Sequence, residues 1–195
     1  STSKNTIVVA PTGVAAINAG GVTIHSMFGL PLTSFIPNND FVDLNVANNR
    51  SSLKKHMRFR KEKRKLLQEL DLLIIDEISM VRADLLDAID FILQEIRHNK
   101  EAFGGLQVVF IGDLYQLPPV VKEHSWQVLR EYYDSPFFFD SYAWKNANAF
   151  TVELDHIYRQ QDEQFINMLN QVRHGEIEEE DLALLNENYS PHAPS

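Results

Sequence analysis

Three short apolar runs along the chain have the composition of strands buried in a sheet. They comprise residues 6–10 (TIVVA), 72–76 (LLIID) and 106–113 (LQVVFIGD). Runs of this length that are rich in β-branched residues are typical of parallel sheets, whose strands are covered on both faces. Residues 151–154 (TVEL) form a weaker run. The pattern therefore predicts three buried strands and a fourth, less regular one.

Segments with helical periodicity lie between and after these runs. Residues 82–97 place apolar side chains every three or four positions, which predicts a helix packed on the sheet. Residues 12–21, 54–70 and 160–173 are also predicted to contain helices, and Gly175 ends the last of them. Strands that alternate with helices form parallel βαβ units. The predicted fold class is therefore α/β, a parallel sheet with helices on both faces.

The long predicted helix over residues 82–97 separates its apolar and acidic side chains. Its apolar face comprises Leu85, Leu86, Ile89, Ile92, Leu93 and Ile96, and the acidic side chains outside this face are Asp84, Asp87, Asp90 and Glu95. This division predicts a helix that packs on the sheet through its apolar face.

Composition limits the class of protein further. The chain has 195 residues, 44% of them hydrophobic, which is enough for one packed core. It contains no cysteine, and its seven histidines lie too far apart for a local zinc motif. No apolar run approaches the roughly 20 residues needed to cross a bilayer, and the polar start STSKN does not resemble a signal peptide. We therefore expect a soluble protein without a membrane partner, located in the cytoplasm or nucleoid of a bacterium or in the nucleus or mitochondrion of a eukaryote.

Charge is distributed unevenly along the chain. The net charge is −9, which argues against a protein that coats duplex DNA by neutralising its phosphates. However, residues 50–65 hold nine of the 18 basic residues and one acid. A solvated amphipathic face is the usual reading of such a segment, and a groove that follows phosphates is the alternative.

Two adjacent carboxylates, Asp76 and Glu77, follow the second apolar run. In a parallel sheet, ligands bind at the carboxyl ends of the strands, so the polar residues there are the first candidates for a site. A carboxylate fixed at a strand end can hold Mg²⁺ while its neighbour orients a water molecule, as in nucleotide hydrolases. The alternative is that the pair only ends the strand and caps a helix beginning near Ser79.

The third run ends in GDLYQLPPV, residues 112–120. Asp113 is its strand-end carboxylate, and Gln116 is an uncharged side chain that can hydrogen-bond a phosphate or a water. The alternative is a surface turn stiffened by two prolines. Further along, LDHIYRQ presents Arg159, a candidate for stabilising charge on a transferring phosphoryl group. An arginine that pairs with surface acids is the alternative.

Residues 10–29 (APTGVAAINAGGVTIHSMFG) are rich in small and hydroxyl-bearing residues. Such a segment allows close approach of a sugar-phosphate chain, with His25 and Phe28 available for base stacking. The alternative is a helix that needs small residues to pack on a sheet, with His25 as a partly buried ring.

Taken together, the motifs in residues 10–29, 72–81 and 112–120, followed by YRQ at 158–160, resemble those of the petite-integration-frequency (PIF-type) helicases. These are superfamily 1 DNA helicases that move 5′ to 3′, with RecD-type helicases as cousins. The resemblance covers most of the chain and implies a RecA-like fold of the P-loop NTPase type. It also implies ATP and Mg²⁺ as cofactors, and single-stranded DNA and forked or structured duplex DNA as partners.

The resemblance implies roles for individual residues. By it, Asp76 binds Mg²⁺, Glu77 acts on the attacking water, Gln116 senses the γ-phosphate and Arg159 touches that phosphate, while Asp113 belongs to the nucleotide site. The single-strand contact motif would include Thr12, Gly13, His25 and Phe28.

The chain departs from the family pattern at one essential motif. It contains no G-x-x-x-x-G-K-[ST] phosphate loop, and the strand before that loop is missing with it. We therefore expect residues 1–175 to be a partial first RecA-like domain and residues 176–195 to begin the connection to a second. The chain alone should neither hydrolyse ATP nor unwind DNA. The gap beyond the strand that ends at Gly112 should be filled by a second chain, or the domain should be distorted.

Two other functions fit the same residues. One is a non-catalytic RecA-like module that binds single strands or a protein partner, and the other is a RecD-like nuclease subunit. The set of Asp76, Glu77, Gln116 and Arg159 favours the motor protein, because a module that only binds has no need for all four.

Overall fold

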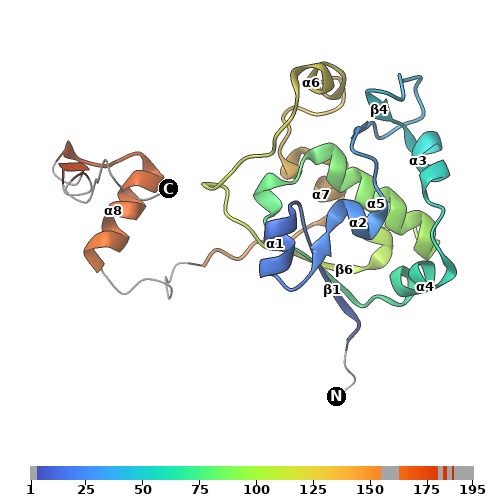
Figure 1. The fold of residues 1–195 in the computed structure, drawn as a ribbon, viewed down its shortest axis with the longest axis horizontal. Coiled ribbons are helices and arrows are strands. Elements are labelled where there is room, and N and C mark those ends of the chain that lie inside the picture. Colours follow the sequence, from blue (N-terminus) through green and yellow to red (C-terminus); the bar gives the residue numbers. More distant parts are fainter. Residues whose placement is uncertain (1–3, 155–162, 180–181, 184–185, 187–195) are drawn as a thin grey trace. The chain divides into compact units, whose positions relative to one another are not determined.

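The computed structural model describes residues 4–154, 163–179, 182–183 and 186, and it divides into two compact units, Ser1–Ala149 and Phe150–Ser195. The strands are β1 (Thr6–Ala10), β2 (Val22–Thr23), β3 (Ser34–Phe35), β4 (Ala47–Asn48), β5 (Leu72–Ile75) and β6 (Gln107–Phe110). The helices are α1 (Gly13–Asn18), α2 (Ile24–Phe28), α3 (Arg50–His56), α4 (Lys61–Glu69), α5 (Ala83–Arg97), α6 (Glu123–Leu129), α7 (Tyr142–Ala147) and α8 (Glu163–His174) (Figure 1). None of the described helices is long and apolar enough to cross a membrane.

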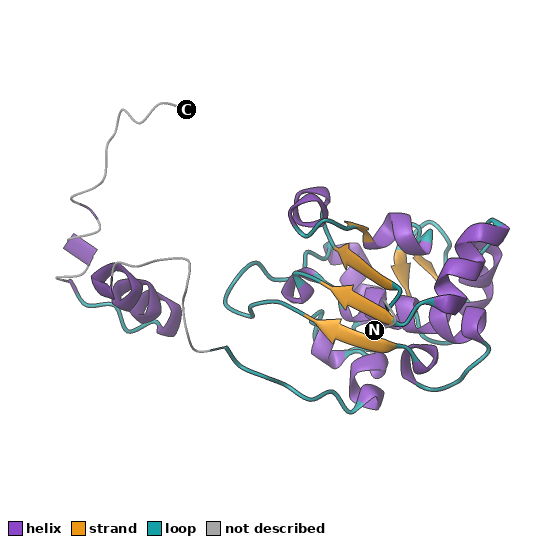
Figure 2. Cartoon of the chain, turned by 90° about the horizontal axis from the view of Figure 1, so that it is seen from below, coloured by secondary structure: helices purple, strands orange, loops and turns teal. Residues whose placement is uncertain are grey.

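A parallel sheet forms the centre of the first unit. Its strand order is β2-β1-β5-β6, and the three longer strands run in the same direction (Figure 2). Ile75 of β5 lies beside Val9 of β1 on one side and beside Phe110 of β6 on the other. The strands β3 and β4 form a separate parallel pair. The predicted α/β class, a parallel sheet flanked by helices, is confirmed.

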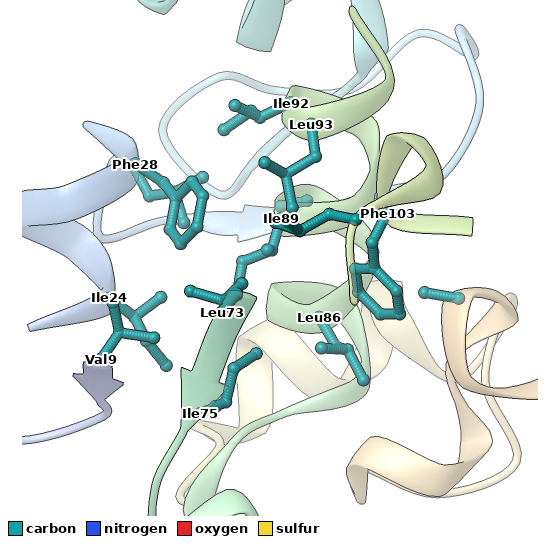
Figure 3. Packing of buried hydrophobic residues seen from close by; sticks show 14 of the residues in the cluster. Val9, Ile24, Phe28, Leu73, Ile75, Leu86, Ile89, Ile92, Leu93 and Phe103 are labelled. Atoms are coloured by element: carbon teal, nitrogen blue, oxygen red, sulfur yellow. The ribbon is translucent and has the colours of Figure 1, made fainter. Parts of the chain in front are cut away.

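Helix α5 supplies much of the core. Its Leu86, Ile89 and Leu93 are fully buried in the same cluster as Leu73 and Ile75 of β5 (Figure 3). These side chains recur at helical spacing, and burying each of them stabilises the fold by roughly 1.5 to 3 kcal/mol. The predicted helix over residues 82–97 is therefore confirmed within one residue, and its apolar face lies in the core.

Two acidic residues of α5, both outside its apolar face, are nevertheless buried. Asp84 and Asp87 are 2% and 5% exposed. Asp84 accepts a hydrogen bond from the backbone N–H of Phe35 at 2.9 Å and pairs with Arg82. Asp87 accepts hydrogen bonds from the Tyr133 hydroxyl at 2.8 Å and, at the start of α7, from two backbone N–H groups. Burial is tolerated because each carboxylate has several donors.

The helix predicted over residues 54–70 is instead two helices, α3 and α4. Between them the chain leaves the helical path, with Met57 buried in the core and Phe59 half-buried against it. A side chain at Gly29 would lie 3.1 Å from the Phe59 ring, so this ring packs closely on the end of α2. Tertiary packing of these two apolar residues thus overrides the helical propensity of the surrounding lysines and arginines.

The last two predicted strands also differ from expectation. Within the described residues β6 pairs only with β5, and its side chains alternate in exposure, with Val109 37% exposed. It is an edge strand, and the prediction of full burial is wrong. Residues 151–154 form no strand, and all four are exposed. A strand needs a hydrogen-bonding neighbour, and no described strand pairs with these residues.

Candidate functional site

Three predicted groups of polar residues lie at one edge of the sheet. Strands β1, β5 and β6 are parallel and in register, so the residues that follow them leave the sheet at the same edge (Figure 2). Thr12 follows β1, Asp76 and Glu77 follow β5, and Asp113 and Gln116 follow β6. Strand direction alone therefore brings these segments to the carboxyl edge, where ligands of parallel sheets bind.

The turn after β5 holds the two carboxylates in different ways. The Asp76 N–H donates to the carbonyl of Val9 at 2.8 Å, and the Asp76 carboxylate accepts from the Glu77 N–H at 2.9 Å. Glu77 has φ 52° and ψ 45°, a left-handed conformation that is uncommon for a residue with a side chain. The chain therefore reverses direction at Glu77, directly after the Asp76 carboxylate.

The helix-capping alternative for this pair finds no support in the geometry. A single 3-10 turn, Ile78–Met80, follows the pair, and the side chain of Glu77 makes no capping hydrogen bond to it. Both carboxylates are half-buried. The Glu77 side chain therefore does not cap the 3-10 turn that follows it.

Asp76 has the properties of a Mg²⁺ ligand. One of its carboxylate oxygens, Oδ1, accepts from the Glu77 N–H, and Oδ2 has no hydrogen bond within the described residues. The described residues contain no cluster of three or more His, Asp or Glu side chains that would hold a metal unaided. Mg²⁺ is usually bound through one or two carboxylates together with phosphates and water. A single fixed carboxylate therefore fits this ion when a nucleotide supplies the other oxygens.

The loop after β6 is anchored to the turn that carries Glu77. The Ile78 N–H donates to the carbonyl of Ile111 at 2.9 Å. Next in the loop, Asp113 accepts hydrogen bonds from the Tyr115 N–H at 3.0 Å and from the Gln116 side-chain amide at 3.4 Å. Gln116 is exposed and lies in the loop that follows β6 at the sheet edge. A backbone hydrogen bond thus joins the loop after β6 to the turn that carries Glu77.

Arg159 lies outside the described residues. Its predicted convergence with the strand-end carboxylates stays a prediction.

The structure gives different roles to Thr12 and Gly13, the first two predicted DNA-contact residues of the 10–29 segment. The Thr12 hydroxyl accepts from the Ala15 N–H at 3.2 Å and so caps the start of α1. Gly13 is exposed, and a β-carbon there would meet nothing within 4 Å. The backbone at this point is therefore open to close approach by a ligand.

Phe28 is part of the hydrophobic core. Its side chain is 1% exposed and lies in the same cluster as Ile24 and Leu73 (Figure 3). The ring is therefore unavailable for stacking on a base, and that part of the prediction is corrected. Helix α2 needs an apolar residue here because this side of the helix packs on the sheet.

A cavity of about 240 Å³ opens beside His25. Its lining includes Thr12, His25, Pro31, Met80, Arg82 and Asp84. His25 is half-buried; burial lowers its pKa, and so does the nearby charge of Arg82, while Asp84 acts in the opposite direction. The ring is therefore neutral near pH 7, which suits contact with an uncharged base more than with a phosphate.

Arg82 and Asp84 form the polar wall of this cavity, and the motifs did not predict this role. The Arg82 guanidinium donates to both Asp84 carboxylate oxygens, at 2.8 and 2.7 Å. Such bidentate pairs hold both side chains in one geometry. Because Arg82 follows the Ile78–Met80 turn, the cavity shares a short segment with the Glu77 turn. The available signal was an arginine two residues before an acid at the start of an apolar helix.

Comparison with known proteins agrees with the motifs. The family model described as PIF1-like helicase matches residues 1–183. The chain is 40% identical over 178 residues to the ATP-dependent DNA helicase PIF1 of Saccharomyces cerevisiae, and 33% identical over 180 residues to that of Homo sapiens. These matches cover 91% and 90% of this chain but only 18% and 24% of the two relatives. The chain thus spans a small part of their length.

Solved structures give the same result. A Bacteroides Pif1 helicase in complex with ADP-AlF3 and ssDNA matches with a TM-score of 0.86 and 42% identity, over 100% of this chain and 42% of that chain. A Pif1 structure that concerns DNA unwinding at forked dsDNA by two coordinating helicases matches with a TM-score of 0.83 and 45% identity, over 95% and 42% of the two chains. The resemblance inferred from the motifs is confirmed. The chain belongs to the PIF1-like helicase family.

Proposed function

We propose that this chain is part of an ATP-dependent DNA helicase that moves 5′ to 3′ along single-stranded DNA and unwinds duplex DNA inside the cell. Residues 1–175 would belong to its first RecA-like domain, and residues 176–195 would begin the connection to a second. The observation that carries the proposal is the anchoring of the Glu77 turn to the Gln116 loop through Ile78 and Ile111. A hydrolase that must couple phosphate chemistry to movement needs two such strand-end loops to respond together.

Each residue at the sheet edge has a distinct task in this proposal. Asp76 would hold Mg²⁺ through Oδ2, and the ion would neutralise charge on the β- and γ-phosphates of ATP. Glu77 would orient the attacking water and accept its proton. Gln116 would contact the γ-phosphate, with Asp113 fixing the orientation of its amide. Arg159 is proposed as the cation that stabilises charge on that phosphate.

The remaining contacts to ATP would come from outside these 195 residues. The sequence has no phosphate loop, so the backbone N–H groups and the lysine that hold the phosphates in P-loop proteins must be supplied elsewhere in the protein. We therefore propose that this chain alone neither hydrolyses ATP nor unwinds DNA. The edge of β6 that pairs with no described strand is the position where a further strand, from the same or a second chain, would pair.

Single-stranded DNA would lie along the carboxyl edge near Thr12, Gly13 and His25. Gly13 allows a sugar-phosphate chain to approach the backbone, and the neutral His25 ring offers a surface for a base. Relatives with solved structures were bound to ssDNA and studied on forked dsDNA, which supports both DNA forms as partners.

The decisive experiment compares Glu77→Gln with the unaltered full-length protein. DNA-stimulated ATP hydrolysis should fall by about 100-fold or more, because removing a general base loses on the order of 10² to 10⁴ in rate. Binding of a non-hydrolysable ATP analogue should persist. Glu69→Gln is the matched control, since Glu69 is exposed and its one salt bridge to a described residue is with Lys65 on the same helix. Unchanged hydrolysis by Glu77→Gln would refute the assignment, and DNA binding without any hydrolysis by the full-length protein would favour the non-catalytic module.

A further inference from the structure

Two cations of the basic segment over residues 50–65 form salt bridges with described acids, one on each side of the break between α3 and α4. Lys54 forms a salt bridge with Glu95 at 2.5 Å, and Lys65 pairs with Glu69 at 3.7 Å. Arg50 lies over the ring of Phe91 at 5.7 Å from its centroid. The cations that remain exposed, with no salt bridge to any described residue, are Lys55, Arg58, Arg60 and Lys61. These four are called the junction cations below, because they lie at or beside the break between α3 and α4.

The path of the chain holds the junction cations together at the surface. Met57, which lies in the break, is 7% exposed and packs in the core. Phe59 packs on the end of α2 at Gly29. With these two apolar residues facing inward, the basic residues around them face solvent. Four like charges within seven residues repel one another, and a polyanion would remove that repulsion.

The junction is fixed to the helix that carries His25. Lys63 of α4 donates to the backbone carbonyl of Ser26 in α2 at 2.7 Å, and its ammonium lies 5.2 Å from the centroid of the Phe59 ring. Together with the contact between Phe59 and Gly29, this attaches the break to the middle and the C-terminal end of α2. The junction cations are therefore held at a constant position relative to the proposed single-strand contact.

The chemistry of this surface suits a phosphate backbone more than bases. Sites for single strands combine positive charge with exposed aromatic rings on which bases stack. Here Phe59 is half-buried beneath Lys63, and no exposed Phe, Tyr or Trp side chain lies among the four cations, where the one exposed ring is that of His56. Charged side chains without stacking partners contact phosphates and carry no base information.

We propose that the junction cations Lys55, Arg58, Arg60 and Lys61 bind the phosphate backbone of duplex DNA, at the duplex arm of a fork whose single-stranded arm lies near His25. The proposal rests on the proposed DNA-binding function and adds a second, separate contact to it. In this arrangement the duplex is held by charge alone, and only the single strand meets the edge of the sheet.

The test measures the affinity of the full-length protein for forked DNA and for single-stranded DNA. The measurements are made without nucleotide, over a range of salt concentrations. The double variant Lys55→Gln, Arg58→Gln removes two junction cations. The control double variant Lys122→Gln, Arg130→Gln removes two exposed cations next to and at the end of α6, so both variants change the net charge equally. For the junction variant, fork affinity should fall about tenfold or more near 0.1 M salt, and the slope of log affinity against log salt should decrease by about 2. Its affinity for a single strand should match that of the unaltered protein.

Each other outcome overturns the proposal in a recognisable way. If both double variants lose fork affinity equally, the effect is one of net charge and the junction has no special role. If the junction variant loses single-strand affinity by the same factor, the cations contact the single strand and the duplex assignment is wrong. If the unaltered protein binds the single strand but the junction variant binds the fork normally, this inference fails while the proposed function stands. If the unaltered protein binds neither DNA, the proposed function fails with it.

Discussion

Gly112 lies directly against Ile78. A β-carbon at position 112 would come within 2.8 Å of the Ile78 side chain and 3.0 Å of its backbone nitrogen. That nitrogen donates to the carbonyl of Ile111, so the loop after β6 rests on the turn that carries Glu77. Any side chain at position 112 must push the two loops apart.

Gly112→Ala should therefore lower both stability and activity. Overpacking at a tight contact typically lowers the free energy of unfolding by about 1 to 3 kcal/mol, and displacement of the Glu77 turn should slow ATP hydrolysis in the full-length protein. Urea unfolding and steady-state hydrolysis measure the two effects. Gly13→Ala is the control for stability, because a β-carbon there meets nothing within 4 Å and alanine favours the helix. Equal stability of the two variants would show that the contact is not tight.

Arg97 should be a major stabilising residue of the fold. Its guanidinium donates to the carbonyls of Leu67, Gln68 and Leu70 at the end of α4 and to that of Gly104, at 3.0 to 3.1 Å. Arg97→Met should lower the free energy of unfolding by about 2 to 3 kcal/mol, since hydrogen bonds to charged donors are strong and carbonyls are left unpaired.

Lysine at position 97 distinguishes geometry from charge. Arg97→Lys keeps the charge but not the planar fork of donors, so it should recover only part of the loss. Chemical denaturation measures these changes, and Arg130→Met serves as the exposed control. Full recovery by lysine would show that charge alone is responsible.

Asp87 should make stability depend on pH. Burial raises its pKa to about 6, against the opposing effect of hydrogen bonds from Ala143, Tyr133 and Tyr142, and the nearby charge of Asp90 adds to the increase. The carboxyl group thus binds its proton more tightly in the folded state than in the unfolded state. Its contribution to stability is fully present below about pH 4 and is lost as the pH rises through about 6.

The comparison with Asp87→Asn isolates this effect, because asparagine does not titrate. The stability of the unaltered protein relative to the variant should fall by up to about 3 kcal/mol between pH 4 and pH 7. Thermal or urea unfolding at several pH values measures the difference. A difference that is constant with pH would mean that Asp87 has an ordinary pKa.

His25 should contribute to single-strand affinity without acting as a cation. His25→Ala should weaken binding of a single-stranded oligonucleotide by about tenfold, within the range of roughly 1 to 3 kcal/mol for a stacked base. Since burial and Arg82 lower the pKa of His25, its contribution should not change between pH 8 and pH 7. Binding titrations at both pH values check this, with His124→Ala on α6 as the control. An affinity that increases on acidification for the unaltered protein but not for the variant would contradict a neutral ring.

The parts of the fold that could be predicted are those specified by local pattern. β1, β5 and α5 have short apolar runs or a long amphipathic stripe, and they were placed within one residue of their observed ends. The two-residue strands β3 and β4 are too short to produce any periodicity. The break between α3 and α4 depends on contacts of Met57 and Phe59 with residues distant in sequence, which helical propensity does not reveal.

The site was predictable to the extent that topology determines it. Parallel strands bring Asp76, Glu77 and Gln116 to one edge whatever their side chains, so strand assignment was sufficient. The burial of Phe28 and the Arg82–Asp84 wall of the cavity depend on packing between separate elements. A phenylalanine in a DNA-contact motif and one in a core look the same in a single sequence.

The backbone at Glu77 has a practical consequence for engineering this domain. A left-handed conformation disfavours a residue with a side chain by roughly 1 to 2 kcal/mol relative to glycine, and Glu77 holds φ 52°. A library sorted only for thermal tolerance would therefore be enriched in glycine at this position, and with the proposed role of Glu77 its most heat-resistant members would lose ATP hydrolysis. Every round of selection from such a library should therefore measure ATP hydrolysis as well as thermal stability.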